Sequence, residues 1–215
     1  MIKAVLFDAD GTLFDSEAIR YKAIAICVRE LLGTEFLEWD EYIKEYVNGS
    51  KSLKELLKID YKTLERLRLK RAELIKEFVK TDLKFMEGAL ELILDLYNHN
   101  FKLGIVSSSR KDEIDSYLKA LKISNYFQGI VTAEDVSKVK PDPEPFIKAL
   151  TRFSIRPEES VVIEDTENGL IAAKKAGIKC VIVPNSYTYT SNFKKADLIV
   201  SSLRELDSDK IKALF

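Results

Sequence analysis

Cysteine, histidine and glycine are all scarce in this sequence. Its 215 residues include two cysteines, one histidine and eight glycines. Cys27 and Cys180 lie far apart, so we expect two reduced, packed thiols of an intracellular protein rather than a disulfide framework. The single histidine, His99, has no partner at a spacing that would suggest a metal site.

Long hydrophobic runs are also missing. The longest, such as residues 178–184, have the length of a strand and are too short to cross a bilayer. Met1, Ile2 and Lys3 lead straight into a predicted strand, without the features of a signal peptide. We therefore expect a cytoplasmic protein with no membrane partner.

Neither sign of charge dominates, because 34 Lys and Arg residues stand beside 35 Asp and Glu residues. This balance argues against a nucleic-acid partner, although it allows a local basic pocket. No long heptad seam is visible, which favours a monomer or a weak dimer. With 46% hydrophobic residues, the chain should still bury a sizeable core.

Short, continuously apolar segments alternate with helical patterns along most of the chain. Continuous hydrophobicity is typical of strands covered on both faces, as in a parallel sheet. The predicted strands are 4–7, 103–106, 129–132, 161–164, 179–183 and 198–200, and the predicted helices between them are 89–98, 112–121, 144–153 and 167–176. This alternation predicts an α/β fold with a Rossmann-like, doubly wound parallel sheet.

One segment, residues 16–83, breaks the alternation. It has no convincing strand, but helical patterns cover 17–32, 37–47 and 64–80. We therefore predict an α/β catalytic core of residues 1–15 and 84–215 with an inserted α-helical cap domain of residues 16–83. Ligands of such sheets bind outside the carboxyl ends of the strands, so an insertion that leaves from this edge could act as a lid.

The strongest chemical signal is a pair of carboxylates, Asp8 and Asp10, directly after the first strand. Side chains alternate along a strand, so both would project to the same side if the strand continued. Two like charges this close are costly without a cation, which indicates a bound divalent metal. The alternative is an Asp-rich turn that merely closes the strand.

Two further stations carry groups suited to a phosphate. Ser107, Ser108 and Ser109 follow the next strand, where hydroxyl and backbone N–H groups could hold phosphate oxygens or simply cap a helix. Lys140 lies in a rigid lead-in with three alternating prolines, so its ammonium can be aimed at a phosphoryl group. The alternative for Lys140 is an ordinary solvated lysine.

A fourth station, Glu164 and Asp165, ends another buried strand. Asp165 could cap the following helix, but Mg²⁺ also favours one or two carboxylates with water and substrate phosphate. Because the carboxyl ends of parallel strands meet at one edge, the acids, the serines and the lysine converge. Convergence favours a phosphoryl-transfer site over four independent structural roles.

Four segments in this order resemble the signature motifs of the haloacid dehalogenase superfamily of phosphatases and phosphomutases: DADGTLFDS, VSSS, VKPDPEPF and VIEDTENGL. The helical insertion between the first two resembles the cap of the branch that contains β-phosphoglucomutase and phosphoglycolate phosphatase. The resemblance implies Mg²⁺-dependent hydrolysis of a small-molecule phosphate ester, with phosphoglycolate or a sugar phosphate as leading substrates. The dehalogenases of this superfamily lack the second aspartate, here Asp10, so we do not expect dehalogenation.

The resemblance also implies catalytic roles. Asp8 would be the nucleophile that forms an aspartyl-phosphate, and Asp10 the general acid and base. Ser107 would hold the phosphate, and Lys140 would neutralise it; Ser108, next to Ser107, is a further phosphate-binding candidate.

For the metal, the resemblance implies that Asp165 binds Mg²⁺ together with Asp8 and the main-chain carbonyl of Asp10. Glu164 would assist or orient the ion. These acids are the expected metal residues.

The leaving group should be selected by the cap, where Arg20 and Lys51 are candidate grips for a second anionic group. A solvated cationic surface explains them equally well. A typical β-phosphoglucomutase has a histidine on the first cap helix and an arginine in the cap turn, where this chain offers Arg20 and Lys51. That departure favours hydrolysis and leaves a phosphomutase as the alternative, with a non-catalytic phosphate-binding protein as the less favoured one.

Overall fold

The computed structural model describes residues 2–49, 51–189 and 191–214. The chain forms two compact units, one of Met1–Asp15 with Lys84–Phe215 and one of Ser16–Leu83. Among the described residues, no helix combines the length and the apolar character needed to cross a membrane.

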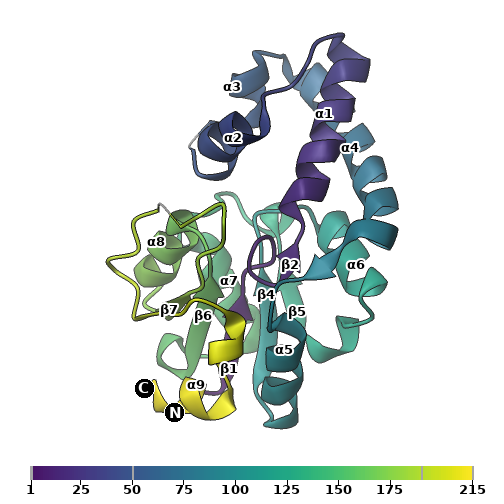
Figure 1. Ribbon diagram of the computed structural model, residues 1–215. Coiled ribbons are helices and arrows are strands. Elements are labelled where there is room, and N and C mark those ends of the chain that lie inside the picture. The colour runs from purple at the N-terminus through teal and green to yellow at the C-terminus, as the bar shows by residue number, and fades with distance from the viewer. Residues whose placement is uncertain (1, 50, 190, 215) are drawn as a thin grey trace. The chain divides into compact units, whose positions relative to one another are not determined.

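The larger unit is built on a parallel sheet of six strands (Figure 1). Its strands, in sheet order, are β5 (Gly129–Val131), β4 (Lys102–Val106), β1 (Ala4–Phe7), β6 (Ser160–Glu164), β7 (Lys179–Ile182) and β8 (Leu198–Ile199). Every neighbouring pair is parallel. The Rossmann-like α/β fold expected from the alternating pattern is therefore confirmed, with β1 central between β4 and β6.

Helices cover both faces of this sheet (Figure 1). They are α5 (Ala89–Asn98), α6 (Lys111–Ala120), α7 (Glu144–Phe153), α8 (Glu167–Lys175) and α9 (Ser208–Ala213). Residues of α7 and α8 share one buried cluster with Leu6 and Val162 of the sheet. Close packing explains two glycines on this face, since a β-carbon at Gly104 or Gly129 would lie 2.4 or 2.5 Å from the ring of Phe153.

Short turns of 3₁₀-helix connect several of these elements. They are η2 (Ser124–Tyr126), η3 (Ala133–Asp135), η4 (Pro157–Glu159) and η5 (Leu203–Glu205). A two-stranded antiparallel ribbon, β2 (Phe14–Asp15) with β3 (Lys84–Phe85), completes the larger unit. The sequence did not predict this ribbon, because two-residue strands are too short to have a hydrophobic period.

The smaller unit is helical throughout its regular elements. It contains α1 (Glu17–Leu32), α2 (Trp39–Tyr42), the π-helical η1 (Ile43–Val47), α3 (Leu53–Leu57) and α4 (Tyr61–Asp82). The predicted helix over 37–47 is thus divided, because the backbone changes to i→i+5 bonding where Asn48 N–H donates to the carbonyl of Ile43 at 2.9 Å.

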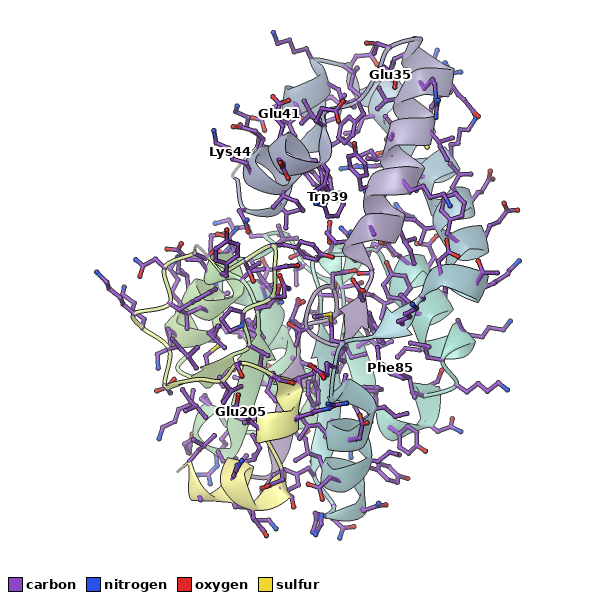
Figure 2. The ribbon with its side chains drawn as sticks, in the orientation of Figure 1. Glu35, Trp39, Glu41, Lys44, Phe85 and Glu205 are labelled. Atoms are coloured by element: carbon purple, nitrogen blue, oxygen red, sulfur yellow. The ribbon has the colours of Figure 1, made fainter. Side chains whose placement is uncertain are left out.

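Aromatic rings form much of the core of this helical unit. The ring of Trp39, which Figure 2 labels, meets the ring of Tyr21 edge to face, with centroids 5.1 Å apart. Tyr42 is fully enclosed and lies 5.9 Å from both Trp39 and Phe36. Edge-to-face pairs of this kind add about 0.5–1.5 kcal/mol beyond the area that they bury.

Candidate active site

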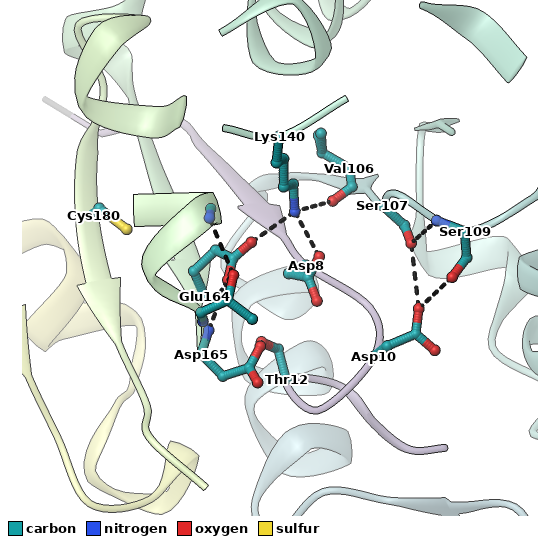
Figure 3. A network of polar contacts seen from close by, with 12 residues as sticks. Asp8, Asp10, Thr12, Val106, Ser107, Ser109, Lys140, Glu164, Asp165 and Cys180 are labelled. Atoms are coloured by element: carbon teal, nitrogen blue, oxygen red, sulfur yellow. Dashed lines mark hydrogen bonds and ion pairs between the residues drawn. The ribbon is translucent and has the colours of Figure 1, made fainter. Parts of the chain in front are cut away.

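The register of the sheet brings three of the motif segments to one edge. Phe7, the last residue of β1, is level with Ile105 of β4 and Ile163 of β6. The chain then leaves all three strands at their carboxyl ends, and the N–H of Asp8 still donates to the carbonyl of Ile163 at 2.9 Å. Side chains that follow these strands therefore share one small, buried region (Figure 3).

Lys140 is at the centre of this region. Its ammonium donates to Asp8 Oδ1 at 2.5 Å, to Glu164 Oε1 at 2.7 Å and to the carbonyl of Val106 at 2.8 Å. Only 5% of its side chain is exposed. Burial lowers the pKa of Lys140, but Asp8 and Glu164 outweigh it and raise that pKa above its ordinary value, so the ammonium stays charged.

Glu164 uses both of its carboxylate oxygens within the protein. Oε1 accepts from Lys140, and Oε2 accepts from the N–H groups of Asp165 and Thr166, at 2.9 and 2.8 Å, and from the Thr166 hydroxyl at 2.9 Å. These backbone donors precede α8, where a helix N-terminus favours negative charge. The geometry fits an acid that orients Lys140 and the start of α8.

Asp165 is buried next to Glu164, and its two oxygens are held from different directions. The Thr12 hydroxyl donates to Oδ1 at 2.8 Å, and the Asn185 side-chain amide donates to Oδ2 at 2.8 Å. Burial and the neighbouring acids Glu164 and Asp8 raise the pKa of Asp165 well above its usual range. Each oxygen keeps a further lone pair with which it could bind a cation.

The acids at this edge form a set that suits a metal ion. One oxygen from each of Asp8, Glu164 and Asp165 lies within 4.8 Å of the other two. Burial raises the pKa of Asp8 to about 8, against the opposing pull of Lys140. One ammonium cannot balance these acids, and a hard divalent cation with oxygen ligands such as Mg²⁺ would.

Asp10 points to the other side of the site, toward Ser107 and Ser109, which follow β4 (Figure 3). The hydroxyls of Ser109 and Ser107 donate to its Oδ2 at 2.6 and 3.4 Å. The N–H of Ser109 in turn donates to the Ser107 hydroxyl at 3.0 Å, while Ser108 is exposed. Asp8 and Asp10 therefore have different partners: Asp8 accepts from an ammonium, and Asp10 accepts from two hydroxyls.

The two candidate substrate-selecting residues belong to the helical unit. On α1, Arg20 Nε lies 3.5 Å from Glu17 Oε2, and the Tyr42 hydroxyl donates to Glu17 Oε1 at 2.5 Å. Lys51 Nζ donates to Glu45 Oε2 at 2.6 Å and is largely exposed. Both cations thus have an acidic neighbour, and their part in selecting substrate stays a prediction.

Sequence reasoning missed the roles of three residues of the site, Thr12, Ser109 and Asn185, of which Ser109 was considered only as a phosphate-binding or helix-capping group. The first two lie inside quoted motifs, but the carboxylates that their hydroxyls bind, Asp165 and Asp10, are 153 and 99 residues away in sequence. Asn185 lies outside these motifs. Its contacts with Gly11 and Asp165 span 174 and 20 residues and exist only because the fold brings these loops together.

The sequence matches the profile of the family described as "Haloacid dehalogenase-like hydrolase" over residues 5–183. The chain belongs to this hydrolase family. The match covers β1 through β7 and so includes all four segments that build the site.

Individual relatives agree with this assignment over nearly the full length. YhcW of Bacillus subtilis (strain 168), which has a provisional description as a phosphatase, is 33% identical over 221 residues, covering 96% of this chain and 94% of the relative. The crystal structure of CbbY from Rhodobacter sphaeroides in complex with phosphate is 25% identical, with a TM-score of 0.87 and 96% of each chain covered. β-Phosphoglucomutase from Clostridium difficile is 26% identical, with a TM-score of 0.81, and covers 100% of this chain and 97% of its own.

These similarities confirm the haloacid dehalogenase resemblance and its branch. They also confirm the expected kind of protein, an enzyme of the phosphatase class in a hydrolase family.

Proposed function

We propose that the chain is a Mg²⁺-dependent phosphatase that hydrolyses a small phosphomonoester of the phosphoglycolate or sugar phosphate class through an aspartyl-phosphate on Asp8. The observation that carries this proposal is the buried contact of Asp8 Oδ1 with Lys140 Nζ at 2.5 Å, beside Asp165 and opposite Asp10. A carboxylate can attack an anionic phosphoryl group only where positive charge offsets the repulsion, and Lys140 supplies such charge at the nucleophile.

In the first half of the reaction, an oxygen of Asp8 attacks phosphorus, and the bond from phosphorus to the leaving oxygen breaks. Asp10, in its protonated form, gives its proton to that oxygen, so an alcohol departs. In the second half, Asp10 takes a proton from a water that attacks the same phosphorus. The bond between phosphorus and Asp8 breaks, and inorganic phosphate and the Asp8 carboxylate are restored.

The hydroxyls of Ser107 and Ser109 hold Asp10 on the opposite side of the site from Lys140. This separation suits two different roles. The nucleophile, Asp8, must be ionised, which a nearby cation favours, whereas the acid, Asp10, must carry a proton. Asp8 and Asp165 would hold Mg²⁺ with the Asp10 carbonyl, and Glu164 would orient Lys140. When bound, the ion adds positive charge that stabilises the phosphoryl oxygens.

The test is phosphate release from a panel that includes phosphoglycolate, β-glucose 1-phosphate and several sugar phosphates, with Mg²⁺ or with a chelator. We expect metal-dependent release that favours one class of compound. Asp8→Asn should abolish turnover and also the aspartyl-phosphate, which is detected as an acid-stable phosphoprotein. Asp115→Asn, at an exposed aspartate paired with Lys111, should leave both unchanged. Normal turnover by Asp8→Asn would rule out the first step.

A phosphomutase is the second candidate, favoured by the similarity to β-phosphoglucomutase. Such an enzyme would convert β-glucose 1-phosphate to glucose 6-phosphate with a bisphosphate activator and would release no net phosphate. Following both products in the same sample separates the two activities. Tight binding of a phosphate mimic without any turnover would point instead to a non-catalytic binding protein.

A further inference from the structure

Asn185 joins two parts of the site that are distant in sequence. It lies after β7, separated from that strand by Val183 and Pro184. Its side-chain nitrogen Nδ2 donates to Asp165 Oδ2 at 2.8 Å and to the carbonyl of Gly11 at 3.0 Å. One amide thus bridges the loop after β1 and the residue that follows β6.

The orientation of this amide is fixed by its own loop. Oδ1 of Asn185 accepts from the N–H of Tyr187 at 2.8 Å, from the N–H of Thr188 at 3.2 Å and from the Thr188 hydroxyl at 3.2 Å. Thr188 is completely buried, and its hydroxyl also accepts from the Asn185 N–H at 3.1 Å. Because these donors occupy Oδ1, Nδ2 is the atom that faces Asp165; a flipped amide would set an oxygen against two acceptors.

The space around the amide is also closed. A β-carbon at Gly11 would lie 2.6 Å from Asp165 Oδ2 and 2.8 Å from Asn185 Nδ2. Gly11 has a φ of +82°, a conformation that favours glycine. The Gly11 backbone, the Asp165 carboxylate and the Asn185 amide therefore touch one another directly, and none can move without disturbing the others.

We propose that Asn185 is a positioning residue for the metal ligand Asp165. The Asn185 amide occupies one lone pair of Oδ2, Thr12 occupies one of Oδ1, and the carboxylate plane is thereby held with its remaining lone pairs available to a cation. Partners that orient a ligating carboxylate typically change metal affinity about 10–100-fold when they are removed. The inference rests on the metal site of the proposed function.

Direct metal binding tests it without relying on turnover. Mn²⁺, which shares the preference of Mg²⁺ for carboxylate oxygens, is titrated into the full chain while the free ion is followed by electron paramagnetic resonance. Asn185→Ala should weaken Mn²⁺ binding roughly tenfold. Asn192→Ala is the matched control, because Asn192 Oδ1 also accepts from the N–H two residues on (Lys194, 3.2 Å) and Asn192 is exposed.

A second variant covers the case in which Asn185→Ala fails to fold. Thr188→Val removes the hydroxyl that holds the amide and keeps the side-chain shape, and it should weaken Mn²⁺ binding by a smaller factor of about two to five. Unchanged affinity in both variants, with a lower melting temperature alone, would show a purely structural loop and overturn the inference. Equal weakening by Asn192→Ala would overturn it as well.

Failure of the proposed function is distinguishable from failure of this inference. If the wild-type chain binds Mn²⁺ but hydrolyses no phosphomonoester, the proposed phosphatase activity is wrong, and the role of Asn185 can still be measured. If the wild-type chain hydrolyses substrate and Asn185→Ala binds Mn²⁺ as tightly as the wild type, only the proposed role of Asn185 is wrong. If the wild-type chain binds no divalent cation, both the proposed function and the proposed role of Asn185 are wrong.

Discussion

A β-carbon added to Gly169 would lie 1.7 Å from Oε1 of Glu164. The carboxylate of Glu164 therefore occupies the space in which any other residue at position 169 would place its side chain. This carboxylate also accepts the hydrogen bond from Lys140, so the missing side chain in the first turns of α8 is linked to the position of the ammonium beside Asp8. Gly169 is helical, and its role is to make room rather than to allow an unusual backbone conformation.

Gly169→Ala should consequently displace Glu164 and deprive Lys140 of one of its two acidic partners. Breaking a buried ion pair costs about 3–5 kcal/mol when one partner is left uncompensated. We expect a loss of stability of that order and a fall in turnover of about a hundredfold, measured by denaturant unfolding and phosphate release. Gly33→Ala is the control for turnover: no atom lies within 4 Å of its β-carbon position, and its φ of +67° adds only a local backbone strain of about 1–2 kcal/mol. Wild-type turnover in Gly169→Ala would contradict the argument.

Lys140 itself provides the second prediction. Lys140→Met keeps most of the side-chain volume but leaves Asp8 and Glu164 buried without the ammonium. We expect kcat to fall about a hundredfold or more, because a preorganised charge at the reacting group is lost. Chemical denaturation should show destabilisation by several kcal/mol, on the order of 3–5.

Lys138→Met is the matched control for Lys140. Lys138 is two residues earlier in the same lead-in, its side chain is 74% exposed, and its nearest acid, Asp142, is 3.9 Å away. A pair of this kind contributes about 0–1 kcal/mol. If the two methionine variants lost activity equally, the buried contacts of Lys140 would not explain its role.

Much of this arrangement was readable from the sequence, and particular residues show why. Each strand of the sheet contains a short apolar run, and β1 begins and ends at the predicted residues because Asp8 and the charged Lys3 bound it. Gly33 and Gly177, both with positive φ, follow predicted helices and mark their ends. Local chemistry is sufficient for features of this kind.

Other features depend on contacts that no local pattern contains. Asn185 reaches Gly11 across 174 residues. Its place after a predicted strand allows its loop to border the site, but the residues of that loop fit an ordinary connection equally well. The ribbon of Phe14 with Phe85 is set by the tertiary pairing of two segments on either side of the insertion. Tertiary proximity of distant segments decides these cases, and a single sequence does not encode it visibly.

Metal removal gives the third prediction. The buried acids Asp8, Glu164 and Asp165 repel one another, and a divalent cation would relieve that repulsion. At a Mg²⁺ concentration one hundred times the dissociation constant, the folded state should gain about 2.7 kcal/mol. For a chain of this size we expect the melting temperature to rise by roughly 5–10 °C.

Calorimetry with Mg²⁺ and with a chelator measures this shift. Asp165→Asn should lose most of it, because an amide is a weaker ligand for a hard cation and removes one negative charge. A shift of the same size in Asp165→Asn and in the wild type would place the stabilising ion elsewhere.

Acid stability provides the last prediction, at the turn that follows β5. Asp135 ends the 3₁₀-turn η3, and its carboxylate accepts from Arg152 Nη2 at 2.6 Å and from the N–H and hydroxyl of Thr132 at 2.9 and 3.0 Å. Burial raises the pKa of Asp135, but the hydrogen bonds from Arg152 and Thr132 outweigh it and lower that pKa from 3.8 to about 2.

A carboxyl whose pKa is lower in the folded than in the unfolded state stabilises the fold above the unfolded value and stops doing so as pH falls through the folded value. The contribution of Asp135 should therefore be fully present above pH 3.8 and disappear toward pH 2. Partial exposure of Arg152 screens the pair, so the expected effect is about 1 kcal/mol.

The free energy of unfolding of Asp135→Asn should lie below that of the wild type near pH 5 and converge with it as pH falls to 2. Asp209→Asn, at a side chain that is 91% exposed, should follow the wild type at every pH. A gap between Asp135→Asn and the wild type that stayed constant down to pH 2 would mean that the carboxylate charge is not what stabilises this turn.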